Sequence, residues 1–229
     1  RLVVEYNTST NPAFEGAVRD TSGRGNDGSF YNGAHYDATK KHFEFDGSND
    51  YIRRSINNAS GDYAHSISLW FKTDKTTVAI GTNEEVLCHI GNQWSAGVNS
   101  YISFYNNRVY AAWHSFNINC ATGDINQQNW NHICVTYTGG GSSITSRKIY
   151  INGTVQTSNR DGSQYQLLNL PANTHLTLGN IRGQSKYLDG SISNFKLYDT
   201  GLTAEEVKTL YDMGRCDEGH HMVNFSKTR

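Results

Sequence analysis

Apolar residues alternate with polar ones in short runs along almost the whole chain, and this pattern constrains the fold more than any other feature. Successive side chains of a β-strand point to opposite faces, so a two-residue period indicates a strand with one buried face. Turn signals separate the runs, and Asn152-Gly153 is typical of a two-residue type I′ hairpin. Many short antiparallel strands predict a sandwich or a barrel. The alternating positions are Phe43 and Phe45, Ile67, Leu69 and Phe71, Ile102 and Phe104, Ile133, Val135 and Tyr137, Ile149 and Ile151, and Leu176 and Leu178.

Two segments near the end of the chain depart from the simple alternation. The run 188–198 changes from a three-residue to a two-residue apolar spacing, which predicts a β-bulge near Ser193. Thr203 and Glu206 then have the spacing of a capping box, which predicts the start of a helix. Gly214 suits the position just past its end.

Length and charge narrow the classes of protein that fit. The 229 residues can form one domain, which we expect to span 1–213, with 214–229 as a tail leading into a longer protein. Lys and Arg total 20 against 21 Asp and Glu, so no net field favours nucleic acid. No stretch approaches the roughly 20 apolar residues that span a bilayer, so membrane insertion is not expected.

Four cysteines and four glycosylation sequons bear on the compartment. Cys88, Cys120, Cys134 and Cys216 lack the short paired spacings of a zinc site, and they permit either three disulfide connectivities or free thiols. Sequons at Asn7, Asn58, Asn152 and Asn224 would be exposed glycan acceptors in a eukaryotic secretory route. Such sequons also arise by chance in Asn- and Ser-rich chains, so the expectation of an extracellular protein rests mainly on the β-rich composition.

Five groups of segments together form a recognisable pattern: 20–28, 45–52, 66–72, 130–137 with 148–153, and 188–192 leading to 202–207. Taken in order, they resemble the concanavalin A-like lectin/glucanase superfamily, in its laminin-G-like and pentraxin-like branch. The resemblance covers nearly the whole chain and implies an all-β, two-sheet jelly roll with one short C-terminal helix. The tail from 214 to 229 lies past the usual end of the family and resembles structural proteins of large algal viruses.

The loop 20–28 is a candidate calcium site. It holds Asp20, Asn26 and further oxygen-bearing side chains among three glycines, which suits a hard cation such as Ca²⁺. The resemblance implies that a structural calcium links this loop to the last core strand, with Asp189 as a second acidic ligand. The alternative is an Asx-turn in which Asp20 only caps its own backbone.

Aromatic residues between 90 and 116 are candidates for carbohydrate binding, because sugar C–H groups stack on flat apolar faces flanked by polar groups. The candidates are Trp94, Tyr101, Tyr105, Trp113 and His114. Tyr101 and Tyr105 alternate against Ile102 and Phe104, so they should face away from the core. Ordinary packing of these rings in a sheet is the alternative for each, and the loops beside Asp20 and Asp46 are the next most plausible place for a sugar site.

No sequence motif supports a catalytic function. Retaining glucanases of this fold need two carboxylates roughly 5 Å apart on an alternating strand, and the sequence has no such strand. We therefore expect a non-catalytic, lectin-like module that binds a glycan or glycoprotein at a cell or virion surface, possibly oligomeric through its parent protein. The alternatives are a protein-interaction or structural module of an adhesin or virion, and, less favoured, a polysaccharide-acting enzyme.

Overall fold

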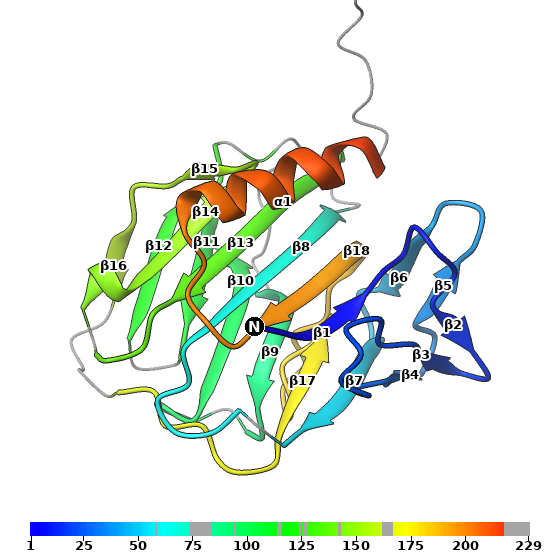
Figure 1. The fold of residues 1–229 in the computed structure, drawn as a ribbon, viewed down its shortest axis with the longest axis horizontal. Helices are drawn as coiled ribbons and strands as arrows, with labels where there is room; N and C mark the ends of the chain where they lie inside the picture. Colours follow the sequence, from blue (N-terminus) through cyan, green and yellow to red (C-terminus); the bar gives the residue numbers. More distant parts are fainter. Residues whose placement is uncertain are drawn as a thin grey trace, which may run out of the picture.

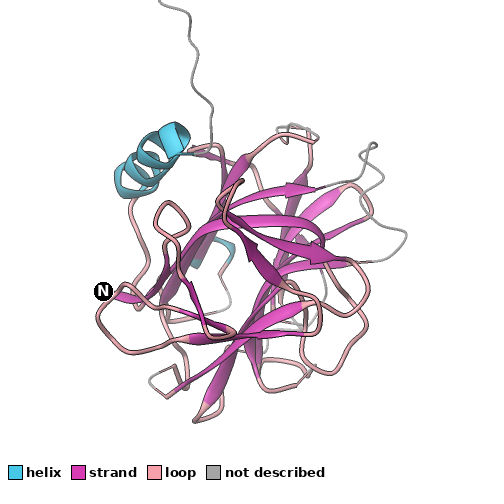
Figure 2. Cartoon of the chain, turned by 90° about the vertical axis from the view of Figure 1, so that its right-hand side faces the viewer, coloured by secondary structure: helices cyan, strands magenta, loops and turns pink. Residues whose placement is uncertain are grey.

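The computed structural model describes residues 1–57, 59–73, 84–93, 95–113, 116–123, 125, 128–141, 143–161 and 167–217. Two antiparallel β-sheets lie face to face, and one helix lies outside the layers (Figures 1 and 2). The predicted jelly-roll sandwich with a C-terminal helix is confirmed. Within the described part of the chain, no helix is long and apolar enough to cross a bilayer.

The first sheet has eight strands and contains both the first and the last strand of the chain. Leu2 pairs with Tyr198 and Tyr6 with Phe195, so the first and last strands of the chain lie side by side. Across the sheet the order is β15 (Thr154–Val155), β14 (Arg147–Ile151), β13 (Asn131–Tyr137), β8 (His65–Thr73), β18 (Asp189–Tyr198), β6 (His42–Asp46) and β5 (His35–Asp37), with β1 (Leu2–Tyr6) also paired to β18. A short 3₁₀ turn, η1 (Ile144–Ser146), precedes β14 in the first sheet.

The second sheet has ten strands and carries the candidate site described below. The strand order of the second sheet is β16 (Asn159–Asp161), β12 (Asn117–Ala121), β11 (Arg108–Ala112), β10 (Asn99–Tyr105), β9 (Glu85–Gly91), β17 (Thr174–Leu178), β7 (Tyr51–Ile56), β4 (Gly28–Tyr31), β3 (Ala17–Val18) and β2 (Ala13–Phe14).

The core lies between the two sheets and is built from the alternating residues. Ile67 and Phe71 of β8 face Ile102 and Phe104 of β10 within one apolar cluster, and all four are at most 1% exposed. Every alternating run named in the sequence analysis forms a strand, because each apolar face is buried against the other sheet.

Three of the cysteines are buried: Cys88 and Cys120 lie in this core, and Cys134 lies in a second apolar cluster with Val207 of the C-terminal helix. Cys88 and Cys134 are buried thiols that form no disulfide. Burial raises the pKa of both thiols. None of the three two-disulfide connectivities therefore forms, since each would require both residues.

The predicted irregularity in β18 is confirmed. The pairing of β18 with β8 shifts by one residue between Ser193 and Lys196, and Asn194 there has a φ of 47°. Thr8 holds this bulge, because its Oγ1 lies 2.6 Å from Oγ of Ser193 and accepts the N–H of Asn194 at 3.1 Å. The bulge lets apolar side chains on both sides of it face the core.

Helix α1 (Ala204–Asp217) begins at the predicted capping box and covers the outer face of the eight-stranded sheet (Figure 1). The Thr203 N–H donates to Oε2 of Glu206 at 2.8 Å, and the Glu206 N–H donates to Oγ1 of Thr203 at 3.3 Å. The expected helix end at Gly214 is wrong, because the helix continues to Asp217, past the domain boundary predicted after residue 213. Gly214 is instead where the helix approaches Trp70 most closely: a Cβ there would lie 2.1 Å from Nε1 of Trp70.

Candidate functional site

The outer face of the ten-stranded sheet presents a row of polar and aromatic side chains. Tyr31 of β4 lies opposite Tyr51 of β7, and Arg53 of β7 lies opposite Thr177 of β17. Residues between them in sequence, such as Ile52, are buried in the core. The alternation that buries one face of β7 therefore places Tyr51 and Arg53 together on the other face.

The two tyrosines form a stacked pair. Their ring centroids are 4.6 Å apart with an angle of 15° between the ring planes. The guanidinium carbon of Arg53 lies 4.2 Å from the ring centroid of Tyr51 and 5.8 Å from that of Tyr31. These contacts hold all three side chains in place, while Tyr31 remains 40% exposed.

A shallow pocket of about 200 Å³ opens beside Tyr31. An exposed ring next to hydroxyl groups, guanidinium donors and a carboxylate acceptor is the combination that saccharide recognition requires. The pocket is lined by Asp27, Ser29, Tyr31, Arg53, Arg54, Ser55 and His175.

A larger pocket of about 430 Å³ lies on the other side of Arg54, which lines both. Gly25 and Asn26 of the predicted calcium loop line it, together with Tyr63 and Asp199. The Nη2 of Arg54 donates to the Gly25 carbonyl at 3.0 Å, which ties the side chain shared by the two pockets to this loop. The pocket at Tyr31 is therefore beside the Asp20 loop, which the sequence analysis named as the alternative place for a sugar site.

The aromatic residues predicted to bind sugar do not form one exposed surface. Trp94 and His114 lie outside the described residues. Tyr105 is 39% exposed, as expected. Tyr101 does point away from the core, but it is 4% exposed because Ile181 packs over it in a separate apolar cluster.

The prediction that Trp113 binds sugar is wrong, because its ring is buried and cannot stack against a ligand. The guanidinium carbon of Arg147, from β14 of the opposite sheet, lies 3.4 Å from the centroid of the Trp113 ring. Arg147 is itself 1% exposed, and its Nη1 donates to the Ala111 carbonyl at 2.8 Å. Tyr137 packs against the same tryptophan with its ring edge-on at 5.1 Å. Trp113 and Arg147 therefore form a buried cation–π contact inside the sandwich.

The Asp20 loop closes on itself. The Asp20 carboxylate accepts N–H groups of Glu5, Ser22 and Asn26 at 2.9, 3.0 and 2.9 Å, and the Ser22 hydroxyl at 2.7 Å. The Asn26 side-chain amide donates to the Val3 carbonyl at 2.8 Å. These are the contacts of the Asx-turn alternative, in which the carboxylate caps backbone N–H groups.

Asp20 and Asp189 do not share a site, so the predicted ligand set is wrong in its geometry. Asp189 pairs with Asp46 at one end of β18, whereas Glu5, whose N–H binds Asp20, pairs with Lys196 further along the strand. Seven residues of strand separate the two positions, roughly 23 Å at about 3.3 Å per residue. Within the described residues, no group of three or more His, Cys, Asp or Glu side chains could hold a metal ion. Calcium binding by this chain stays a prediction, but Asp20, Asn26 and Asp189 do not lie together as one set of ligands.

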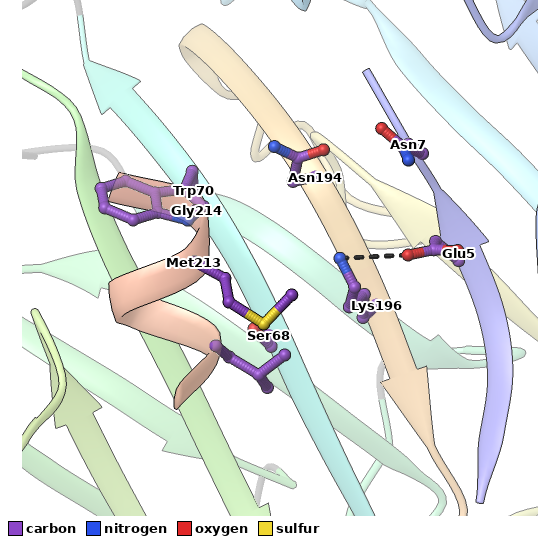
Figure 3. A pocket seen from close by; sticks show the side chains of 9 residues that line it. Glu5, Asn7, Ser68, Trp70, Asn194, Lys196, Met213 and Gly214 are labelled. Carbon is purple, nitrogen blue, oxygen red and sulfur yellow. Dashed lines mark ion pairs between the residues drawn. The ribbon is translucent and has the colours of Figure 1, made fainter. Parts of the chain in front are cut away.

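A third pocket, of about 190 Å³, lies between α1 and the eight-stranded sheet (Figure 3). Trp70 and Gly214 close one end, and Met213 reaches over it from the helix. Nζ of Lys196 lies 3.1 Å from Oε1 of Glu5 on the paired strand β1, so the two charges neutralise each other. Asn7, Ser68, Asn194 and Leu210 complete the lining.

Each of these three pockets is lined by a single carboxylate: Asp27, Asp199 and Glu5 respectively. Retaining glycoside hydrolysis requires a pair of carboxyl groups about 5 Å apart, and inverting hydrolysis a pair about 6.5–9.5 Å apart. Among the described residues, none of these three pockets is lined by the carboxyl pair of either mechanism.

Paired terminal strands, two face-to-face antiparallel sheets and a polar, aromatic outer face define a jelly-roll β-sandwich of the concanavalin A type. A family model described as the concanavalin A-like lectin/glucanases superfamily (Laminin_G_3) matches residues 46–208. The match spans well over half of the chain, and the chain belongs to this family. A search of curated protein sequences found no match.

Solved structures of bacterial toxin and enzyme domains share the fold. The receptor binding domains of botulinum neurotoxin C/D mosaic serotype and serotype G are each 17% identical, with TM-scores of 0.64 and 0.65. The matches cover 93% of this chain and 51% of each of those chains, so this chain spans about half of their length. Domain 4 of AbnA, a GH43 extracellular arabinanase from Geobacillus stearothermophilus, in complex with arabinotriose, is 19% identical with a TM-score of 0.62; the match covers 92% of this chain and 98% of that one. None of these named proteins is viral, so the viral resemblance of the tail gains no support.

Proposed function

We propose that this chain is a non-catalytic glycan-binding module whose site is the pocket beside Tyr31 on the ten-stranded sheet. The observation that carries the proposal is the exposed Tyr31 ring, held by Tyr51 and Arg53 at the edge of a pocket with hydroxyl, guanidinium and carboxylate groups. A rigid aromatic ring supplies contact area at low entropic cost, and the surrounding polar groups match sugar hydroxyls.

The family and its structural relatives support a saccharide as the ligand. The chain belongs to a superfamily described as lectins and glucanases, and arabinanase domain 4 is described in complex with arabinotriose. The term receptor binding domain, used for the botulinum neurotoxin structures, is compatible with either a glycan or a protein partner. A single shallow sugar site binds weakly, so useful attachment would need several copies in a longer, extracellular parent protein.

The first test compares two tyrosines of equal exposure on the same sheet. Tyr31→Ala should weaken binding of the best glycan-array ligand at least about twentyfold, because loss of an aromatic hot spot costs roughly 2 kcal/mol. Tyr105→Ala is the matched control, since Tyr105 is 39% exposed against 40% for Tyr31 but lies away from the pocket. Titration calorimetry measures both affinities, and thermal melts establish that both variants are folded.

Three outcomes separate the hypotheses. Loss of affinity only in Tyr31→Ala supports the pocket beside Tyr31. Loss only in Tyr105→Ala would move the site to the residues that the sequence alone suggested. Absence of any ligand on an array displayed at high valency would overturn the glycan proposal and favour a protein partner.

A further inference from the structure

Positively charged and imidazole side chains gather at the inner side of the proposed glycan site. Thr177 of β17 pairs with Arg53 on β7 and with His89 on β9, so these side chains form one row across three neighbouring strands. Arg182, from the segment that follows β17, reaches back over this face, and its Nη1 lies 2.9 Å from Nδ1 of His175. His175 lines the same pocket as Tyr31.

Neither arginine of this group forms an ion pair with a carboxylate of the described residues. Arg53 donates through Nε to the Thr177 hydroxyl at 3.2 Å, and Arg182 contacts His175. Burial is the main cause of the lowered pKa of Arg53, and the charge of Arg182 contributes to it. Burial likewise lowers the pKa values of His89 and His175, with smaller contributions from both arginines. Two cations close enough to repel each other form a site that a bound anion would stabilise.

His89 adds an independent sign of a missing partner. Its side chain is fully buried, and neither Nδ1 nor Nε2 has a hydrogen-bond partner among the described protein atoms. A Cβ atom on Gly91 would lie 3.0 Å from Nε2, so only a glycine lets the backbone pack this closely against that edge of the ring. Buried polar nitrogens are normally paired, and an unpaired one beneath two arginines fits an acceptor that arrives with a ligand.

The carboxylate that lines this pocket does not neutralise the arginines. Asp27 accepts the backbone N–H of Asp20 at 2.7 Å through Oδ1. It belongs to the loop on the β4 side of the pocket, away from Arg182 and the β17–β9 row. Its remaining acceptor capacity suits the hydroxyl groups of a sugar ring.

We infer that the ligand is an acidic saccharide, whose carboxylate or sulfate group binds between Arg53 and Arg182 while its sugar ring lies against Tyr31. This inference rests on the proposed glycan-binding function and specifies the class of ligand. A guanidinium group can donate paired hydrogen bonds to two oxygens of a planar carboxylate or of a tetrahedral sulfate, which makes arginine better suited to this task than a single point charge.

The experiment uses matched saccharide pairs and charge-matched variants. Oligosaccharides that carry a carboxylate or a sulfate ester are titrated against the same oligosaccharides with that group neutral or absent. We expect the acidic member of a pair to bind at least about tenfold tighter, and Arg182→Gln to remove that advantage, because charge-assisted hydrogen bonds are the strong ones. Arg215→Gln is the control, since it removes the same charge from exposed α1 on the other sheet.

The outcomes distinguish this inference from the proposed function. Equal binding of neutral and acidic members, still dependent on Tyr31, would overturn the acidic-ligand inference and leave the glycan site standing. A preference for acidic ligands that falls equally in Arg182→Gln and Arg215→Gln would reflect net charge and would also overturn it. Arg182→Lys should bind the acidic ligand more tightly than Arg182→Gln but less tightly than the parent protein. This comparison separates the effect of the positive charge from that of the paired guanidinium hydrogen bonds. Binding of no saccharide of either kind would overturn both proposals.

Discussion

At the scale of single residues, Gly214 sets how closely α1 approaches the eight-stranded sheet. Replacing Gly by Ala inside a helix ordinarily stabilises it by about 1 kcal/mol. Here we expect Gly214→Ala to lower the free energy of unfolding by about 1–3 kcal/mol, because the added Cβ would lie 2.1 Å from Nε1 of Trp70 and forces the helix or the indole to move. Urea unfolding measures the change. Gly123→Ala is the control, since an added Cβ there meets no atom within 4 Å. A Gly214→Ala variant as stable as the parent would contradict this account of the contact.

At the scale of elements, α1 depends on its capping box for its first turn. Thr203→Ala removes the hydroxyl that accepts the Glu206 N–H, and we expect a loss of about 1 kcal/mol in the free energy of unfolding. Thr209→Ala provides the comparison within the same helix, because the Thr209 hydroxyl only donates to the Glu205 carbonyl, which the helix already engages. Alanine has the higher helix propensity, so this second variant should be neutral or slightly more stable. Equal destabilisation of the two variants would show that the cap contributes nothing specific.

At the scale of the whole molecule, three buried histidines make stability depend on pH. Burial lowers the pKa of His65 to about 4 and the pKa values of His89 and His132 to about 3. Below about pH 6.5 the unfolded chain takes up protons that the folded chain excludes, so stability is full above this pH and falls as the pH decreases. The slope approaches about 1.4 kcal/mol per pH unit for each histidine. Urea unfolding between pH 7 and 5, where carboxylates stay ionised, should show this decline. A constant free energy of unfolding over that range would refute it.

The sequence by itself determined the local parts of this protein. Alternation fixed the strands and their buried faces, as at Ile67 and Phe71, because a two-residue period encodes the direction of each side chain without reference to the rest of the fold. The capping box at Thr203 is equally local, and so is the Asn152-Gly153 hairpin, where both residues have the positive φ of 50° and 78° that a type I′ turn requires. The phase change near Ser193 located the bulge for the same reason.

Only the tertiary structure decided which side chains on the outer faces are open and which charges meet. Alternation correctly turned Tyr101 away from the core, but Ile181 from a distant segment covers it. Tyr31 and Tyr51 become neighbours through the register of β4 with β7, and the one available signal was that Tyr51 and Arg53 alternate against the apolar Ile52. Arg182 arrives at the same site from beyond β17. Periodicity assigns a side chain to a face, whereas exposure and electrostatic environment depend on long-range packing over that face, which no local pattern records.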